Sequence, residues 1–143
     1  MKDFMKEAFK EAKKAELENE IPIGCVIVLD NKIISRGHNT REKTQNALCH
    51  AEVNAINKAC KKLKSWRLDR AIIYVTLEPC PMCAGAIANA RIQKIVYGAK
   101  DKSSQDCLCE KILSSTRLNH KVEMFYEERI ECSQILTNFF RKK

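Results

Sequence analysis

The sequence has no long hydrophobic run, no internal repeat and no low-complexity segment. No apolar stretch approaches the roughly 20 residues that span a bilayer, which argues against a membrane protein. Nor does a linker rich in proline, glycine and serine divide the chain, whose 143 residues include only four glycines and three prolines. A chain of this length is most simply one unit, so we expect a single domain over residues 1–143.

An apolar signal core is also absent, because the segment 1–20 carries charged residues throughout. We therefore expect a cytoplasmic protein. The chain has 26 Lys and Arg against 18 Asp and Glu, a net charge of +8. Such an excess suggests a polyanionic partner such as a nucleic acid, although many basic proteins are simply soluble.

Hydrophobic spacing predicts an alternation of helices and strands. Helices are expected over residues 1–18, 50–63, 81–90, 109–113 and 130–141. Strands are expected over residues 21–29, 32–36, 71–77, 92–99 and 122–126. The first two strands form a hairpin around Asp30-Asn31, and the polar segment 37–48 reads as a loop. This order predicts an α/β fold with a mostly parallel central sheet and helices on both faces.

Eight cysteines stand out in a chain with no export signal. Because the cytosol keeps thiols reduced, metal binding or thiol chemistry is a better interpretation than a disulfide framework. Three of them lie in apolar patterns and are expected in the core: Cys25, Cys60 and Cys132. Cys107 and Cys109 are either surface thiols or part of an auxiliary metal or redox site.

Two short segments bring together residue types that bind zinc. Cys80 and Cys83, three residues apart, occupy one face of a helix that begins near Pro81. A helix N-terminus stabilises thiolates, and His50 at the start of another helix adds an imidazole. Two thiolates and one imidazole suit a tetrahedral zinc ion, so we expect one Zn²⁺ per chain.

The fourth ligand position decides between a structural and a catalytic zinc site. Further side chains that could close the site are Cys49, Cys60, Cys107, Cys109, His38 and His120. Glu52 favours an open, catalytic site, because a carboxylate two residues from His50 could move protons to and from water without binding the metal. A thiol–disulfide motif at Cys80–Cys83 is the other alternative, but it gives His50 and Glu52 no role.

The pattern His50-x-Glu52 followed by Pro79-Cys80-x-x-Cys83 is typical of zinc nucleobase deaminases. Together with Ile23-Gly24 and the segments 75–86, 90–92, 96–99, 118–123 and 139–141, it makes the chain resemble the cytidine deaminase-like superfamily. Within that superfamily it is most similar to bacterial tRNA-specific adenosine deaminases. The resemblance implies a three-layer α/β/α sandwich, a homodimer, and conversion of the wobble adenosine in a tRNA anticodon to inosine.

Residue by residue, the resemblance makes His50, Cys80 and Cys83 the zinc ligands and Glu52 the proton carrier. It also implies that Asn39 and the backbone of Ala51 contact the target base. Without the resemblance, Asn39 is better interpreted as an asparagine that caps a loop. Two segments depart from the family pattern, Ala47–Cys49 and Lys102–Cys109, and the second falls where the family shapes its nucleic-acid groove.

A tRNA anticodon arm is therefore the expected partner, with RNA phosphates held by a set of basic residues: Lys58, Lys61, Lys62, Lys64, Arg67, Arg70 and Arg141–Lys143. One rival is a deaminase of a free base or nucleoside, such as guanine or cytosine, on the same scaffold. A second is a zinc-stabilised RNA-binding protein without catalytic turnover.

Overall fold

The computed structural model describes residues 2–102 and 108–142. Within these ranges the chain forms helices α1 (Phe4–Leu17), α2 (Arg41–Thr44), α3 (Ala51–Leu63), α4 (Pro81–Asn89), α5 (Leu108–Leu113) and α6 (Ile130–Arg141). The strands are β1 (Gly24–Leu29), β2 (Lys32–His38), β3 (Ile72–Val75), β4 (Lys94–Tyr97) and β5 (Glu123–Tyr126). Every helix and strand that the hydrophobic spacing predicts is present.

The strands of the described residues form one sheet in the order β2-β1-β3-β4-β5. Strand β1 is antiparallel to both β2 and β3, whereas β3, β4 and β5 pair in parallel. Four of the five strands thus run in one direction, but the hairpin places β1 against them. The sheet is therefore mixed in its pairings, two antiparallel and two parallel, while four of its five strands are parallel to one another, in agreement with the predicted α/β fold.

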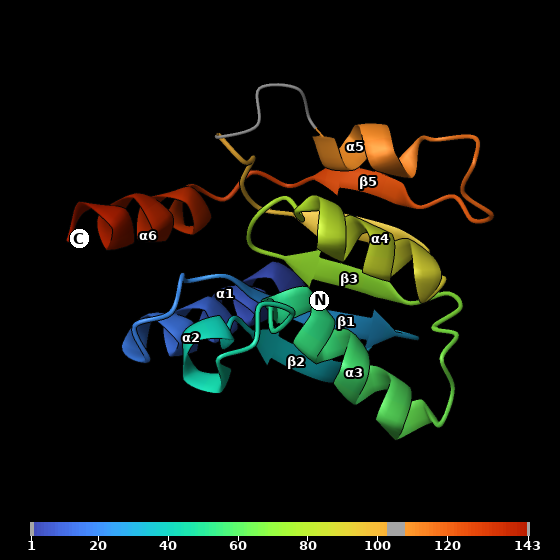
Figure 1. Cartoon of the computed structure of the whole chain (residues 1–143), viewed down its shortest axis with the longest axis horizontal. Coiled ribbons are helices and arrows are strands. Elements are labelled where there is room, and N and C mark those ends of the chain that lie inside the picture. Colours follow the sequence, from blue (N-terminus) through green and yellow to red (C-terminus); the bar gives the residue numbers. More distant parts are fainter. Residues whose placement is uncertain (1, 103–107, 143) are drawn as a thin grey trace.

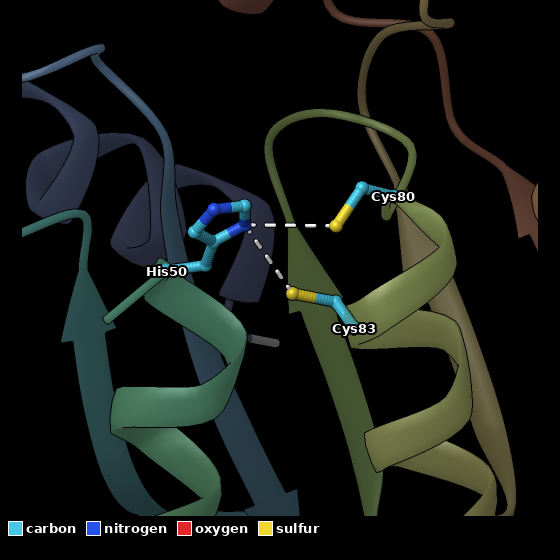
Figure 2. Close-up of side chains that lie close together, drawn as sticks. All are labelled: His50, Cys80 and Cys83. Atoms are coloured by element: carbon cyan, nitrogen blue, oxygen red, sulfur yellow. Dashed lines mark hydrogen bonds between the residues drawn. The ribbon is translucent and has the colours of Figure 1, made fainter. Parts of the chain in front are cut away.

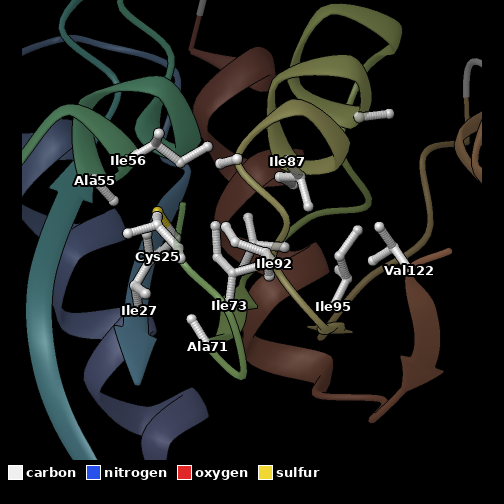
Figure 3. Close-up of a cluster of buried hydrophobic side chains, with 14 of the residues drawn as sticks. Cys25, Ile27, Ala55, Ile56, Ala71, Ile73, Ile87, Ile92, Ile95 and Val122 are labelled. Carbon is white, nitrogen blue, oxygen red and sulfur yellow. The ribbon is translucent and has the colours of Figure 1, made fainter. Parts of the chain in front are cut away.

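Helices cover both faces of this sheet and give the expected three layers (Figure 1). On one face, α1 and α6 pack against the sheet through a cluster that includes Met5, Val96 and Cys132. On the other face, α3, α4 and α5 enclose the larger core, where Ile27, Ile73 and other side chains are fully buried (Figure 3).

The segment between β2 and α3 is not the plain loop that its polar sequence predicts, because it contains α2. The buried carboxylate of Glu20 accepts hydrogen bonds from the backbone N–H groups of Glu42 at 3.0 Å and Lys43 at 2.7 Å. These are first-turn N–H groups with no partner inside the helix. A cap supplied from more than 20 residues away has no local sequence signal.

The two longest helices of the α3/α4/α5 layer begin at the same edge of the sheet. Helix α3 follows β2 and α4 follows β3, and these two strands run in the same direction. Because the loops after parallel strands meet at one edge of a sheet, the starts of α3 and α4 face each other across it. No helix of the described residues is long and apolar enough to cross a membrane.

Candidate active site

His50, Cys80 and Cys83 meet at the starts of α3 and α4. His50 is the residue immediately before α3, and Cys80 holds the equivalent position before α4, with Pro81 at its first turn. Cys83 lies one turn further on and is fully buried. Figure 2 shows the imidazole of His50 turned toward both sulfur atoms. The structure therefore brings together the three residues that the sequence predicted as ligands.

The distances between these side chains fit a tetrahedral zinc site. His50 Nδ1 lies 3.6 Å from Cys80 Sγ and 3.6 Å from Cys83 Sγ. Zinc bonds of about 2.0–2.1 Å to nitrogen and 2.3 Å to sulfur, at tetrahedral angles, separate the two ligand atoms by about 3.6 Å. The three ligand atoms lie within 4.8 Å of one another and form a group able to hold a metal ion.

Among the described residues, no further histidine, cysteine or acidic residue joins this group. His38 instead lies 2.9 Å from the carboxylate of Glu18, and His120 donates to the Ile92 carbonyl at 2.8 Å. Cys109 is buried in the core, which excludes the surface thiol considered above. Cys107 lies outside the described residues. A site of three protein ligands is typical of catalytic zinc, which keeps one position for water or substrate.

The group itself favours metal binding by lowering the proton affinity of one thiol. Hydrogen bonds from Cys83 and from His50 lower the pKa of Cys80 to about 4, against the opposing effect of burial. The hydrogen bond to Cys80 raises the pKa of His50. Contact with Cys80, together with burial, raises the pKa of Cys83. Cys80 is therefore a thiolate at neutral pH, and thiolates are the form of cysteine that binds metals.

Glu52 lies in the first turn of α3 and points into the same group. Its side chain is 4% exposed, and its carboxyl group is hydrogen-bonded to the Cys83 thiol. Burial raises the pKa of Glu52 to about 7, and the nearby Cys80 charge adds to this rise. Glu52 can thus hold a proton near neutral pH, and its carboxyl group lies against Cys83 without joining the group formed by His50, Cys80 and Cys83.

Ala51 directly follows His50, and both Ala51 and Asn39 have contacts inside the protein. Asn39 is buried at the end of β2, and its side-chain oxygen accepts a hydrogen bond from Arg41 N–H at 3.1 Å. This is the loop-capping contact that its sequence context predicted. The Ala51 carbonyl accepts from the Cys25 thiol at 3.2 Å. At Ala51, the N–H in the first turn of α3 is therefore the backbone group suited to contact a ligand.

Two buried glutamates that the sequence reasoning missed hold the segments on either side of the site. Glu20 caps α2, which leads to His50, as described above. Glu78, only two residues before Cys80, is 5% exposed and accepts a hydrogen bond from Asp101 N–H at 3.2 Å. Their partners lie more than 20 residues away in sequence. The signal that could have found Glu78 is its place directly before Pro79-Cys80.

Most of the predicted basic set lies away from His50, Cys80 and Cys83. Lys61, Lys62 and Lys64 lie at the far end of α3, and Arg67 and Arg70 follow it. Lys58 donates to the Arg36 carbonyl at 3.0 Å. Arg141 and Lys142 end α6, and Lys143 lies outside the described residues. Of the cysteines expected in the core, Cys25 and Cys132 are fully buried, but Cys60 is only partly so.

Comparison with known proteins shows the family of this chain. All of its residues, 1–143, match the MafB19-like deaminases. The chain belongs to this deaminase family. It is 49% identical over 143 residues to the tRNA-specific adenosine deaminase of Bacillus subtilis, and this match covers 97% of this chain and 88% of that protein. The Aquifex aeolicus tRNA-specific adenosine deaminase is 40% identical, over 97% of this chain and 93% of its own length.

Solved structures confirm the cytidine deaminase-like fold of this family member. A tRNA:A34 deaminase from a study of A-to-I editing at the wobble position of transfer RNA superposes with a TM-score of 0.87 and 38% identity. That match covers 93% of this chain and 98% of the solved one. A guanine deaminase from Bacillus subtilis superposes with a TM-score of 0.67 and 33% identity, over 98% and 92% of the two chains.

Proposed function

We propose that this deaminase hydrolyses adenosine to inosine at the wobble position of a tRNA anticodon, and that residues 1–143 form its single catalytic domain. The observation that carries the proposal is the meeting of His50, Cys80 and Cys83 at zinc-ligand spacing beside the buried Glu52. The proposed substrate is inferred from the relatives, because the tRNA-specific adenosine deaminase of Bacillus subtilis is 49% identical to this chain.

His50, Cys80 and Cys83 would hold one Zn²⁺, whose chemistry there is to make a bound water more acidic. Two thiolates already neutralise the formal charge of the ion, which weakens this effect. A nearby group that accepts a proton from this water is therefore needed more than at a zinc ion with neutral ligands. Glu52 is the carboxyl group placed to do so, because it lies against Cys83 and is shielded from solvent.

Hydrolysis of adenosine consumes one water and releases one ammonia. The attacking water must lose a proton, and the departing amine at C6 must gain one. In this proposal the Glu52 carboxylate takes one proton from the attacking water and gives it to N1 of the base. It then carries the second proton, from the new C6 hydroxyl, to the departing amine, so the enzyme is unchanged after each turnover. Asn39 and the Ala51 N–H would hydrogen-bond the flipped-out base and hold C6 near Glu52.

The zinc-loaded protein would act as a homodimer in the cytoplasm, on the anticodon arm of tRNA. The resemblance to tRNA deaminases supports both the partner and the assembly, and the net charge of +8 suits a polyanion. Light scattering of the zinc-loaded protein measures its assembly directly. A mass of about twice that of one chain is expected, whereas the mass of a single chain would contradict the homodimer.

A free-base deaminase is the second candidate, favoured by the 33% identity to a solved guanine deaminase. The deciding experiment incubates the zinc-loaded protein with a panel of anticodon stem-loops, free adenosine, guanine and cytosine, and measures released ammonia and inosine. We expect turnover of a stem-loop with adenosine at the wobble position and none of the free compounds. Turnover of guanine alone would favour the second candidate, and no turnover at all would favour a non-catalytic RNA-binding protein.

A further inference from the structure

An exposed tryptophan lies at the end of the molecule opposite the metal-ligand group. Trp66, the only tryptophan of the chain, is 59% exposed. It follows α3, whose 13 residues separate it from His50 by about 20 Å at 1.5 Å per residue. In Figure 1 the green segment after α3 runs on from the end of the helix that points away from the start of α4.

Cationic side chains gather around this ring. The guanidinium of Arg67 lies 5.3 Å from the centre of the Trp66 ring, and that of Arg91, just after α4, lies 5.6 Å from it. We call the following residues the Trp66 surface: Lys61, Lys62, Lys64, Trp66, Arg67, Arg70 and Arg91. Arg67 pairs with Asp69 and Arg70 with Asp30. Within the described residues, no acidic group pairs with the three lysines, so the surface is positively charged.

The backbone that carries Trp66 is fixed, so its exposure is not that of a loose loop. Ser65 N–H donates to the Cys60 carbonyl at 3.1 Å, and Leu68 N–H donates to the Ala90 carbonyl at 2.7 Å. Leu68 itself is 1% exposed. The ring is therefore held in water between two anchored residues.

Folding alone accounts for the lysines but not for the tryptophan. Cations at the end of α3 interact favourably with the helix dipole. A large ring left in water gains nothing from burial, and tryptophans in this situation are enriched at binding surfaces. An aromatic ring among lysines and arginines is the combination that binds unpaired nucleic-acid bases, by stacking for the base and by charge for its phosphates.

We propose that the Trp66 surface binds RNA, with an unpaired base stacked on the Trp66 ring and the neighbouring lysines and Arg91 on its phosphates. A second copy of the chain fits this surface less well, because two such surfaces would repel each other. The proposal is argued from the residues of this surface alone. At about 20 Å from His50, the bound RNA segment cannot be the nucleotide in the candidate active site, so its binding does not depend on deamination.

Because Trp66 is the only tryptophan, its fluorescence reports directly on this surface. The test titrates the zinc-loaded protein with a 12-nucleotide single-stranded RNA and, separately, with an RNA duplex of equal length. We expect the single strand to quench Trp66 fluorescence to saturation, with an affinity that falls steeply as salt rises. Less quenching by the duplex is expected, since its bases are already stacked on one another.

Variants then measure affinity by the anisotropy of labelled RNA. Stacking of one base predicts that Trp66→Ala weakens single-strand binding by about 5- to 150-fold, and that Trp66→Phe weakens it less. Phe125→Ala is the matched control, because Phe125 is 52% exposed and also lies beside a cation, Lys94, at 5.1 Å. Its affinity should equal that of the unmodified protein.

Several results would overturn the proposal. One is an unchanged RNA affinity in Trp66→Ala, and another is equal quenching by duplex and single strand, which would leave only charge attraction. If Trp66→Ala instead changes the mass in light scattering and leaves RNA affinity unchanged, the surface joins two copies of the chain. Since fluorescence and anisotropy require no turnover, failure here is distinguishable from failure of the proposed deamination.

Discussion

Gly37 allows β2 to approach the first turn of α3, and replacing it tests how the fold holds His50. A Cβ at this position would overlap the Ala51 carbonyl oxygen and come 2.8 Å from Ala55 N, whereas ordinary contacts begin at 3.4 Å. In Gly37→Ala the first turn must therefore retreat by at least about 0.6 Å. Overpacking of this kind costs about 1–3 kcal/mol of the free energy of unfolding.

The same shift moves His50, which directly precedes Ala51. Metal sites tolerate ligand displacements of only about 0.2 Å, and changes that disturb ligand orientation typically cost about 10–100-fold in metal affinity. We therefore expect Gly37→Ala to lower both the free energy of unfolding in urea and the affinity for zinc in competition with a chromogenic chelator.

Gly85→Ala is the matched control, because a Cβ there has no atom within 4 Å. Gly85 lies inside α4, two residues after Cys83, so the added methyl group restricts the unfolded chain without a clash. A gain of about 0.4–1 kcal/mol is expected, with unchanged zinc affinity. If Gly37→Ala matches the unmodified protein in both measurements, the close packing of β2 against α3 does not hold His50 in place.

Two further predictions concern contacts away from the ligands. Glu20→Gln places an amide against the N–H groups of Glu42 and Lys43, which should lower the free energy of unfolding by about 1–3 kcal/mol and speed hydrogen exchange at those two amides. Exchange at the unmodified rate would show that Glu20 does not hold α2. The control is Glu42→Gln, because the side chain of Glu42 is exposed. A hydrogen bond from Arg129 lowers the pKa of Asp3. The stability from this ion pair is therefore present above the ordinary pKa of aspartate and is lost as pH falls through the lowered one. Asp3→Asn should cost at most about 1 kcal/mol near pH 7, and urea unfolding should show this difference shrinking below about pH 4; a difference that is constant with pH would refute the role of the pair.

The sequence predicted most of the fold because helical and strand spacing are local signals. Periodic apolar residues located helices such as α3 and α6, and β-branched runs located strands such as β1 and β3. The hairpin turn at Asp30-Asn31 predicted that β1 and β2 are antiparallel, but local spacing could not predict that β1, and not β2, pairs with β3, because the order of strands depends on contacts made only in the folded chain. Helix α2 was missed for a related reason, since its cap comes from Glu20 through the folded chain.

At the candidate site the residue types could be predicted from the sequence, whereas the distances and hydrogen-bond partners are known only from the structure. His50, Cys80 and Cys83 were predictable because helix starts, thiol spacing and the imidazole combine into a known pattern. The distance of the lysines from this group follows from the same helix, because His50 precedes α3 whereas Lys61, Lys62 and Lys64 lie at its other end. Glu78 was missed because its partner, Asp101 N–H, is brought to it only by folding.

The most direct test of the proposed chemistry is Glu52→Gln in the zinc-loaded protein. The variant keeps the size of the side chain but removes its ability to carry a proton. We predict about one zinc per chain in the variant, as in the unmodified protein, and inosine formation on a wobble-adenosine stem-loop at least about a hundredfold slower. Inosine formation at the unmodified rate, with zinc retained, would contradict the assignment of Glu52 as the proton carrier.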